Sequence, residues 1–146
     1  MSNIKEYLIN DHRSCDHLFT KMEDQANVSL VDAKEITEAF IRDMERHFQR
    51  EERVMFPEFE TKTGMVNGPT EMMRQEHMQM RNLMQQLLEA IDNENKDKFF
   101  GLSETLMILL QQHNMKEEQM LYTMAQQHLG SEADRIVEMM DALVVE

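Results

Sequence analysis

The sequence predicts an all-α protein: an antiparallel up-and-down four-helix bundle followed by a short C-terminal fifth helix. Apolar residues recur every three or four positions along four long stretches, which is the spacing of one helix face. Short polar or Gly/Pro-containing segments separate these stretches, and long helices with short links pack as antiparallel neighbours. With only 4 glycines and 2 prolines, the chain lacks the turn residues of a β protein. Its 146 residues are the length of one domain, residues 1–146.

The first two helices are expected over residues 4–25 and from about residue 30 onward. A short loop separates them, and Ser29 with Asp32 three residues later resembles a capping box that opens the second helix. Pro57 is expected to kink or end the second helix, because its ring removes a backbone donor and clashes with the preceding turn.

The third helix begins at Pro69, after the clearest break in the chain, residues 61–69. The fourth helix is expected over residues 98–129, with Met120 among its inward positions. A short fifth helix follows and ends near residue 145.

The chain is strongly acidic. Its 28 Asp and Glu against 15 Lys and Arg give a formal net charge of −13, which argues against partners such as nucleic acid or an anionic membrane. The single cysteine excludes an intramolecular disulfide framework. We see no secretory signal and no run near the roughly 18 apolar residues of a membrane span. A cytoplasmic location is therefore expected.

Histidine replaces an apolar inward residue once in each long helix. The four positions are His12, His47, His77 and His113. In the second and fourth helices a glutamate follows four residues later, as Glu51 and Glu117. Residues four apart share a helix face, so each pair points into the same space. A lone inward histidine is usually a core residue, but imidazoles and carboxylates that converge in this way are typical of a metal site.

The chain also repeats itself. Residues 47–56 align with residues 113–122 at an offset of 66, and residues 10–12 align with residues 75–77 at an offset of 65. Each half therefore brings two histidines and one glutamate, which suits two metals held by imidazoles and bridged by both carboxylates. Nitrogen and oxygen donors without thiolate favour iron or manganese, with zinc also open.

These motifs resemble the hemerythrin-like, HHE cation-binding family. The matching segments, in family order, are Asp11-His12, His47-Phe48, Glu51-Glu52, Met55-Phe56-Pro57, Glu76-His77, His113, Glu117-Glu118 and Leu121-Tyr122. The resemblance implies a four-helix bundle around a non-haem di-iron site.

By the same resemblance, one iron would be bound by His12 and His47 and the other by His77 and His113. Glu51 and Glu117 would bridge them. The implied cofactors are two iron ions (Fe2+/Fe3+), oxo- or hydroxo-bridged, with manganese or zinc less favoured.

The chain departs from the oxygen-carrying hemerythrins at two positions. Arg81 stands where they add a second histidine to the third helix, and their last carboxylate corresponds to Glu118. We prefer Glu117 as the bridge, because its spacing matches the internal repeat. With fewer histidine ligands, each iron should keep a position for water, hydroxide or a small ligand.

Asp16 and Arg81 are equivalent in the repeat and follow a ligand histidine by four residues. They are either unrelated solvated charges or an ion pair near the metals that orients the ligands, and Asp16 as a direct iron ligand stays open. Tyr122 either packs in the core or donates a hydrogen bond to a bridging carboxylate or a metal-bound ligand.

The remaining residues near these motifs have plainer interpretations. Cys15 is expected to be buried packing rather than a ligand, and His17 and His128 are expected at the surface. Glu52 and Glu118 are expected at solvated or boundary positions. The 16 methionines are interpreted mainly as flexible core filling.

The favoured function is a di-iron protein that binds or senses a small diatomic molecule or oxidant, such as O2, NO or peroxide. One alternative is an enzyme that removes NO or peroxide at the same site, although no flavin, haem or iron–sulfur motif supplies electrons and the redox partner is unknown. Another is an iron-handling or iron–sulfur repair protein. The last is an interaction module without metal.

Overall fold

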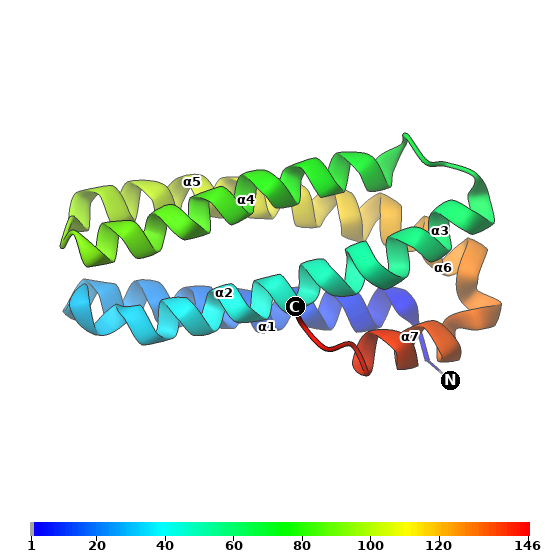
Figure 1. Ribbon diagram of the computed structural model, residues 1–146, viewed down its shortest axis with the longest axis horizontal. Coiled ribbons are helices and arrows are strands. Elements are labelled where there is room, and N and C mark those ends of the chain that lie inside the picture. The colour runs from blue at the N-terminus through cyan, green and yellow to red at the C-terminus, as the bar shows by residue number, and fades with distance from the viewer. Residues whose placement is uncertain (1) are drawn as a thin grey trace.

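The computed structural model describes residues 2–146, and this part of the chain contains helices and turns but no strand. Its four long helices are α1 (Ile4–Val28), α2 (Lys34–Arg50), α4 (Pro69–Asp92) and α5 (Lys96–Lys116). Figure 1 shows α1 beside α2 and α4 beside α5, so that two helical hairpins lie against each other. The predicted all-α four-helix bundle is confirmed. Below, α1 with α2 is the N-terminal hairpin and α4 with α5 is the C-terminal hairpin.

The second helix of each hairpin continues through one π-helical turn into a further helix. These segments are η2 (Glu51–Met55) with α3 (Phe56–Thr63), and η3 (Glu117–Leu121) with α6 (Tyr122–Leu129). Pro57 does not end the helical rod, since helical structure runs on to Thr63. Pro57 occupies the first turn of α3, where a missing backbone donor is tolerated.

The π-helical turn in η3 also corrects the predicted inward face of the last long helix. Met120 was expected inside, but its exposed fraction is 59%. A π-helical turn holds one residue more than an α-helical turn, so it shifts the inward face by one position. Leu121 and Tyr122 are buried in its place.

Short links join the long helices. Helix α1 runs on to Val28, beyond its predicted end, and Ser29 Oγ then accepts a hydrogen bond from the backbone N–H of Asp32 at 3.4 Å. A single 3-10 turn, η1 (Val31–Ala33), leads into α2. Gly64, with a φ of +76°, ends α3 in the left-handed region, where glycine has no steric penalty.

The short fifth helix is α7 (Ala133–Asp141), which follows the 3-10 turn η4 (Gly130–Glu132). The chain then turns back along α2, as Figure 1 shows. Arg53 Nη1 donates to the carbonyl of Val144 at 2.8 Å, and the backbone N–H of Glu146 donates to Gln49 Oε1 at 3.0 Å. These bonds hold the C-terminal residues against the N-terminal hairpin.

The core consists of two apolar clusters separated by a polar layer. One cluster fills the end of the bundle near the α1–α2 link, and its members include Phe19, Phe40 and Leu106. The other packs α3, α6 and α7 together, with members such as Phe59 and Ile136. The four inward histidines lie along their helices between members of the two clusters, so the polar layer is enclosed at both ends.

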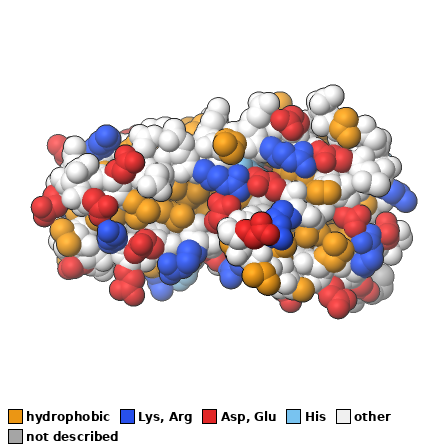
Figure 2. Space-filling model, viewed as in Figure 1, with side chains coloured by type: hydrophobic (Ala, Val, Ile, Leu, Met, Phe, Trp, Pro, Cys, Tyr) orange, Lys and Arg blue, Asp and Glu red, His pale blue; other side chains and the backbone are white. Residues whose placement is uncertain are grey.

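Charged side chains cover the outside of the bundle. Figure 2 shows acidic and basic side chains interspersed over one face. None of the helices in residues 2–146 has the length and apolar character needed to cross a bilayer.

Candidate metal centre

The six predicted ligands meet in the polar layer. The four histidines come from α1, α2, α4 and α5, and the two glutamates come from η2 and η3. His12, His47, Glu51, His77, His113 and Glu117 are each at most 2% exposed. Their inward atoms form two groups, each compact enough to surround one cation. One group consists of His12, His47 and Glu117, and the other consists of Glu51, His77, His113 and Glu117.

The two glutamates lie between the histidine pairs. Glu117 Oε1 is 3.0 Å from His12 Nε2, 3.8 Å from His47 Nε2 and 3.2 Å from His113 Nε2. Glu51 Oε1 is 3.3 Å from His47 Nε2 and 3.1 Å from His77 Nε2. Each carboxylate therefore contacts imidazoles of both hairpins, which is the placement expected of a bridging ligand.

Both glutamates begin a π-helical turn. In these turns the backbone N–H of Phe56 bonds to the carbonyl of Glu51, and that of Tyr122 bonds to the carbonyl of Glu117. A residue five positions after the glutamate is thereby brought to its face of the helix. Isolated π-helical turns are frequent at functional sites, and here they place an aromatic ring beside each carboxylate.

The outer nitrogen of every inward histidine donates to a carboxylate on another helix. The Nδ1 pairs are His12 with Glu118 (2.7 Å), His47 with Asp11 (3.0 Å), His77 with Glu52 (2.6 Å) and His113 with Glu76 (2.8 Å). A carboxylate only accepts, so these bonds place the proton on Nδ1 and turn Nε2 toward the centre. Such partners orient metal-ligating histidines and raise their basicity.

Each of these outer carboxylates also meets a cation. The pairs are Glu118 with Arg13 (3.2 Å), Asp11 with Arg50 (2.6 Å), Glu52 with Arg81 (2.9 Å) and Glu76 with Lys116. The centre therefore has an ordered outer ring in which every imidazole contacts an acid and every acid contacts a base.

The outer carboxylates were the main omission of the sequence-based interpretation. Glu52 and Glu118 were assigned to solvated or boundary positions, and their 21% exposed side chains do lie at the boundary, but their bonds to histidines were not foreseen. The repeat relates these four carboxylates in two equivalent pairs, but it does not show that they face imidazoles. Asp11 and Glu76 each precede a predicted ligand histidine, and Glu52 and Glu118 each follow a predicted bridging glutamate.

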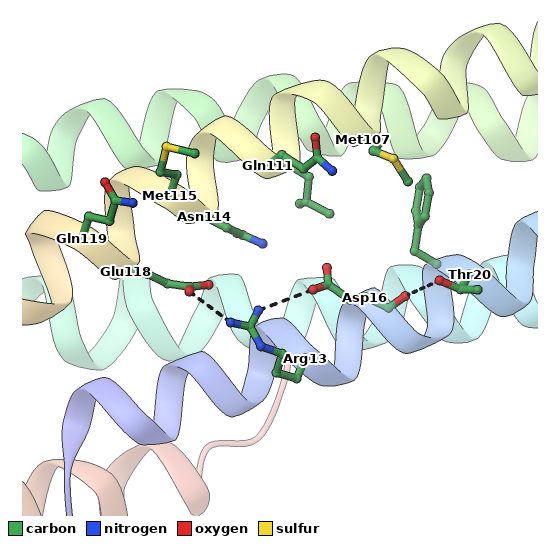
Figure 3. Close-up of a pocket in the computed structure, with 11 residues that line it drawn as sticks. Arg13, Asp16, Thr20, Met107, Gln111, Asn114, Met115, Glu118 and Gln119 are labelled. Atoms are coloured by element: carbon green, nitrogen blue, oxygen red, sulfur yellow. Dashed lines mark hydrogen bonds and ion pairs between the residues drawn. The ribbon is translucent and has the colours of Figure 1, made fainter.

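Asp16 and Arg81 do not form an ion pair, which was one of the alternatives left open by the sequence. Asp16, with a 52% exposed side chain, lies at the surface and pairs with Arg13 at 3.6 Å (Figure 3). Because an aspartate side chain is short, it does not reach the buried histidines from this position. Arg81 is longer and reaches Glu52, through which it acts on His77.

Tyr122 lies inside the centre rather than in the surrounding apolar core. Its Oη is 2.7 Å from Glu51 Oε2 and 2.8 Å from Glu117 Oε1, so the hydroxyl can donate to either carboxylate. This is the hydrogen-bonded alternative of the two interpretations drawn from the sequence. Burial, together with Glu117 and Glu51, raises the pKa of Tyr122 well above its ordinary value.

The other residues considered lie outside the centre. Cys15 is buried in the apolar cluster, where its thiol donates to Asp43 Oδ2 at 3.4 Å. His17 and His128 are exposed. Glu118, the alternative bridge, lies at the rim of the layer and belongs to neither donor group.

Strong electrostatic attraction holds the imidazoles and carboxylates together. Burial lowers the pKa of His113, but Glu117 and Glu76 outweigh it and raise that pKa to about 10. Burial also opposes the charge on Glu117, but His113 and His12 hold its pKa well below the ordinary value. Metal binding must displace the imidazole protons, and the same carboxylates that raise the pKa of His113 would also attract a metal cation.

The donor set fits a metal ion. Within residues 2–146, four of the five buried side-chain polar atoms without a hydrogen-bond partner belong to the centre. They are Nε2 of His77, Nε2 of His113, Oε1 of Glu51 and Oε2 of Glu117. An unpartnered buried polar atom costs about 1–3 kcal/mol, and a shared cation removes that cost for all four.

A comparison with family models supports this interpretation. The model of the hemerythrin HHE cation-binding domain matches residues 3–125. The chain therefore belongs to this family, and the resemblance seen in the sequence is confirmed. Comparisons with curated proteins and with solved structures gave no match.

Proposed function

We propose that this member of the hemerythrin HHE cation-binding family holds two iron ions and binds or senses a small diatomic molecule or oxidant, such as O2, NO or peroxide. The observation that carries the proposal is the pair of buried donor groups that share Glu117. His12 and His47 would hold one ion, and His77 and His113 the other, with Glu51 and Glu117 between them. Imidazole and carboxylate donors without a thiolate favour iron or manganese, and the resemblance to the hemerythrin-like family favours iron.

The residues of the chain leave room for a further ligand. Four imidazoles and two carboxylates shared by two metals provide fewer donors than two complete coordination shells need. Bound iron would supply an open coordination position and a change of oxidation state. Phe48 stacks on His77 with a centroid distance of 4.0 Å, and Phe56 with one of 5.9 Å, so apolar rings exclude water from this side of the centre.

A groove between α1 and α5 supports access for a small ligand. Its volume is about 480 Å³, and Figure 3 shows Arg13 and Glu118 among the residues that line it. Glu118 also bonds to His12, so the groove ends one side chain away from a predicted ligand. The buried residues Phe19 and Leu110 form its apolar part.

Metal analysis combined with optical spectra tests the proposal. The full chain should bind two irons, and its spectrum should change when O2, NO or azide is added. His12→Ala should lose one metal, whereas His17→Ala, which removes an exposed histidine from the same helix, should retain both. A reversible change with O2 indicates binding or sensing, and continuous consumption of NO or peroxide indicates turnover. Zero or one metal per chain would overturn the paired centre.

A further inference from the structure

One pair of repeat-equivalent residues inside the centre differs by a hydroxyl group. Tyr122 and Phe56 are equivalent residues, each five positions after a bridging glutamate and each fully buried. Their rings also lie alike, because the Tyr122 centroid is 5.4 Å from His12 and the Phe56 centroid is 5.9 Å from His77. At this pair of equivalent rings, the two halves of the centre differ by a single hydroxyl group.

That hydroxyl lies among the inward atoms of one metal position. Tyr122 Oη is 3.0 Å from His12 Nε2, 3.4 Å from His47 Nε2 and 2.8 Å from Glu117 Oε1. These three atoms belong to the donor group that contains only three residues. The His77–His113 position has no such hydroxyl, because Phe56 stands there, and it has Glu51 as its fourth residue.

We propose that Tyr122 is a protein ligand of the cation held by His12 and His47, so that the two metal positions are chemically different. This inference rests on the proposed function, since it requires both positions to bind metal. With Tyr122 included, each position has four protein donors. One set contains a phenol oxygen, and the other contains a second carboxylate.

The spacing of the four atoms agrees with this assignment. Donors that share one metal at about 2.0–2.2 Å lie roughly 3–3.5 Å from one another. The distances from Tyr122 Oη to the three other donors run from 2.8 to 3.4 Å. When a cation binds, the phenol O–H bond breaks, the oxygen keeps the electron pair as phenolate, and the proton leaves to water.

Iron(III) spectroscopy of the full chain tests the assignment. Protein loaded with ferrous iron under argon and then oxidised with ferricyanide should show a phenolate-to-iron(III) charge-transfer band in the visible region. Excitation into this band should enhance tyrosine ring vibrations in the resonance Raman spectrum. Tyr122→Phe should lose the band, and the isosteric change keeps the aromatic ring in the core.

Zn2+ titrations provide a readout that is independent of redox chemistry. Tyr122→Phe should weaken one of the two Zn2+ sites by roughly 10–100-fold or more and leave the other unchanged. The reciprocal variant Phe56→Tyr, made in the Tyr122→Phe background, should restore the charge-transfer band at the other position. It serves as the matched control, because it retains one tyrosine in the centre.

The outcomes separate this inference from the proposed function. Two bound metals without a phenolate band would overturn the assignment of Tyr122 and leave the paired centre standing. Weaker Zn2+ binding in Tyr122→Phe without such a band in the wild type would also overturn it, because a hydrogen bond to Glu51 or Glu117 would explain the loss. Failure to bind two metals would overturn both.

Discussion

The N-terminal and C-terminal hairpins place the equivalent histidines His12 and His77 in the centre, but the arginines behind their outer carboxylates differ. His12 is supported through Glu118 by Arg13, whose side chain is 60% exposed and makes one hydrogen bond to that carboxylate. The equivalent His77 is supported through Glu52 by Arg81. Arg81 is 26% exposed and makes four hydrogen bonds, two to Glu52 and two to Glu45.

The outer partners of the other two histidines are equivalent in the repeat. Asp11 and Glu76 support His47 and His113 in the same way, and the cations behind them, Arg50 and Lys116, are also equivalent. The equivalent partners indicate what both proposed metal positions would need. The unequal partners indicate where the two positions can differ in ligand access and affinity. The groove between α1 and α5 is lined by Arg13, the arginine that makes fewer hydrogen bonds to its carboxylate partners.

The largest expected effect is the loss of one metal position by substitution of its histidine. A site kept at a thousandfold excess over its Kd adds about 4 kcal/mol to the free energy of unfolding. The wild type should therefore gain about twice as much from Zn2+ as either His12→Gln or His77→Gln. Urea unfolding with Zn2+ and with a chelator measures this gain for each protein.

The pair of variants tests whether the halves act separately. Each should keep one metal and about half of the metal-dependent stabilisation. If either single substitution abolished both metals, the centre would be one inseparable unit, and the two hairpins would not hold their metals separately.

A smaller effect is expected from the two arginines. Arg81→Met leaves Glu45 and Glu52 side by side without their cation, so it should lower the free energy of unfolding by about 2–3 kcal/mol. Arg13→Met removes an exposed pair and should change it by less than about 0.5 kcal/mol. Chemical unfolding of the metal-free proteins compares the two variants directly. Equal losses would show that the supports are equivalent despite their geometry.

The fold was predictable because its cause is local. The 3/4 spacing of apolar residues and the breaks near Gly64 and Pro69 determine long helices, and short links determine their antiparallel packing. The π-helical turns were not predictable in this way. They begin at the buried residues Glu51 and Glu117 and have no simple signal in the apolar spacing, so the expected inward position of Met120 failed.

The inward histidines and glutamates were predictable from local spacing, since a histidine or glutamate on an apolar helix face is unusual. The outer carboxylates were not, because an acidic residue at a helix boundary looks the same whether it faces water or an imidazole. Only tertiary packing decides between these cases. Asp16 shows the opposite error, in which the right spacing on one helix gave no contact across the bundle.

The smallest expected effect concerns a second pair of unequal equivalents, Glu60 and Gln126, which the offset of 66 relates. Glu60 Oε2 accepts from Arg74 Nη1 and from Thr70 Oγ1, both at 2.6 Å, and so ties α3 to the start of α4. Gln126 Oε1 accepts from the backbone N–H of Ile4 at 2.8 Å and ties α6 to the start of α1. The hydrogen bonds of Glu60 therefore include an ion pair, whereas the hydrogen bond of Gln126 joins neutral groups.

Glu60→Gln should leave a neutral side chain at both positions. It should also remove the pH dependence that Glu60 gives to the free energy of unfolding. Hydrogen bonds from Arg74 hold the pKa of Glu60 below its ordinary value, so Glu60 stabilises the fold above the unfolded-state pKa of about 4.3. This stabilisation is lost as the pH falls through the lower folded-state pKa. The variant should therefore be about 1–2 kcal/mol less stable than the wild type at pH 7, and the difference should shrink in acid. Urea unfolding from pH 7 to pH 3 measures the difference, and Gln126→Met, which loses a neutral tie, should differ from the wild type by the same amount across that range.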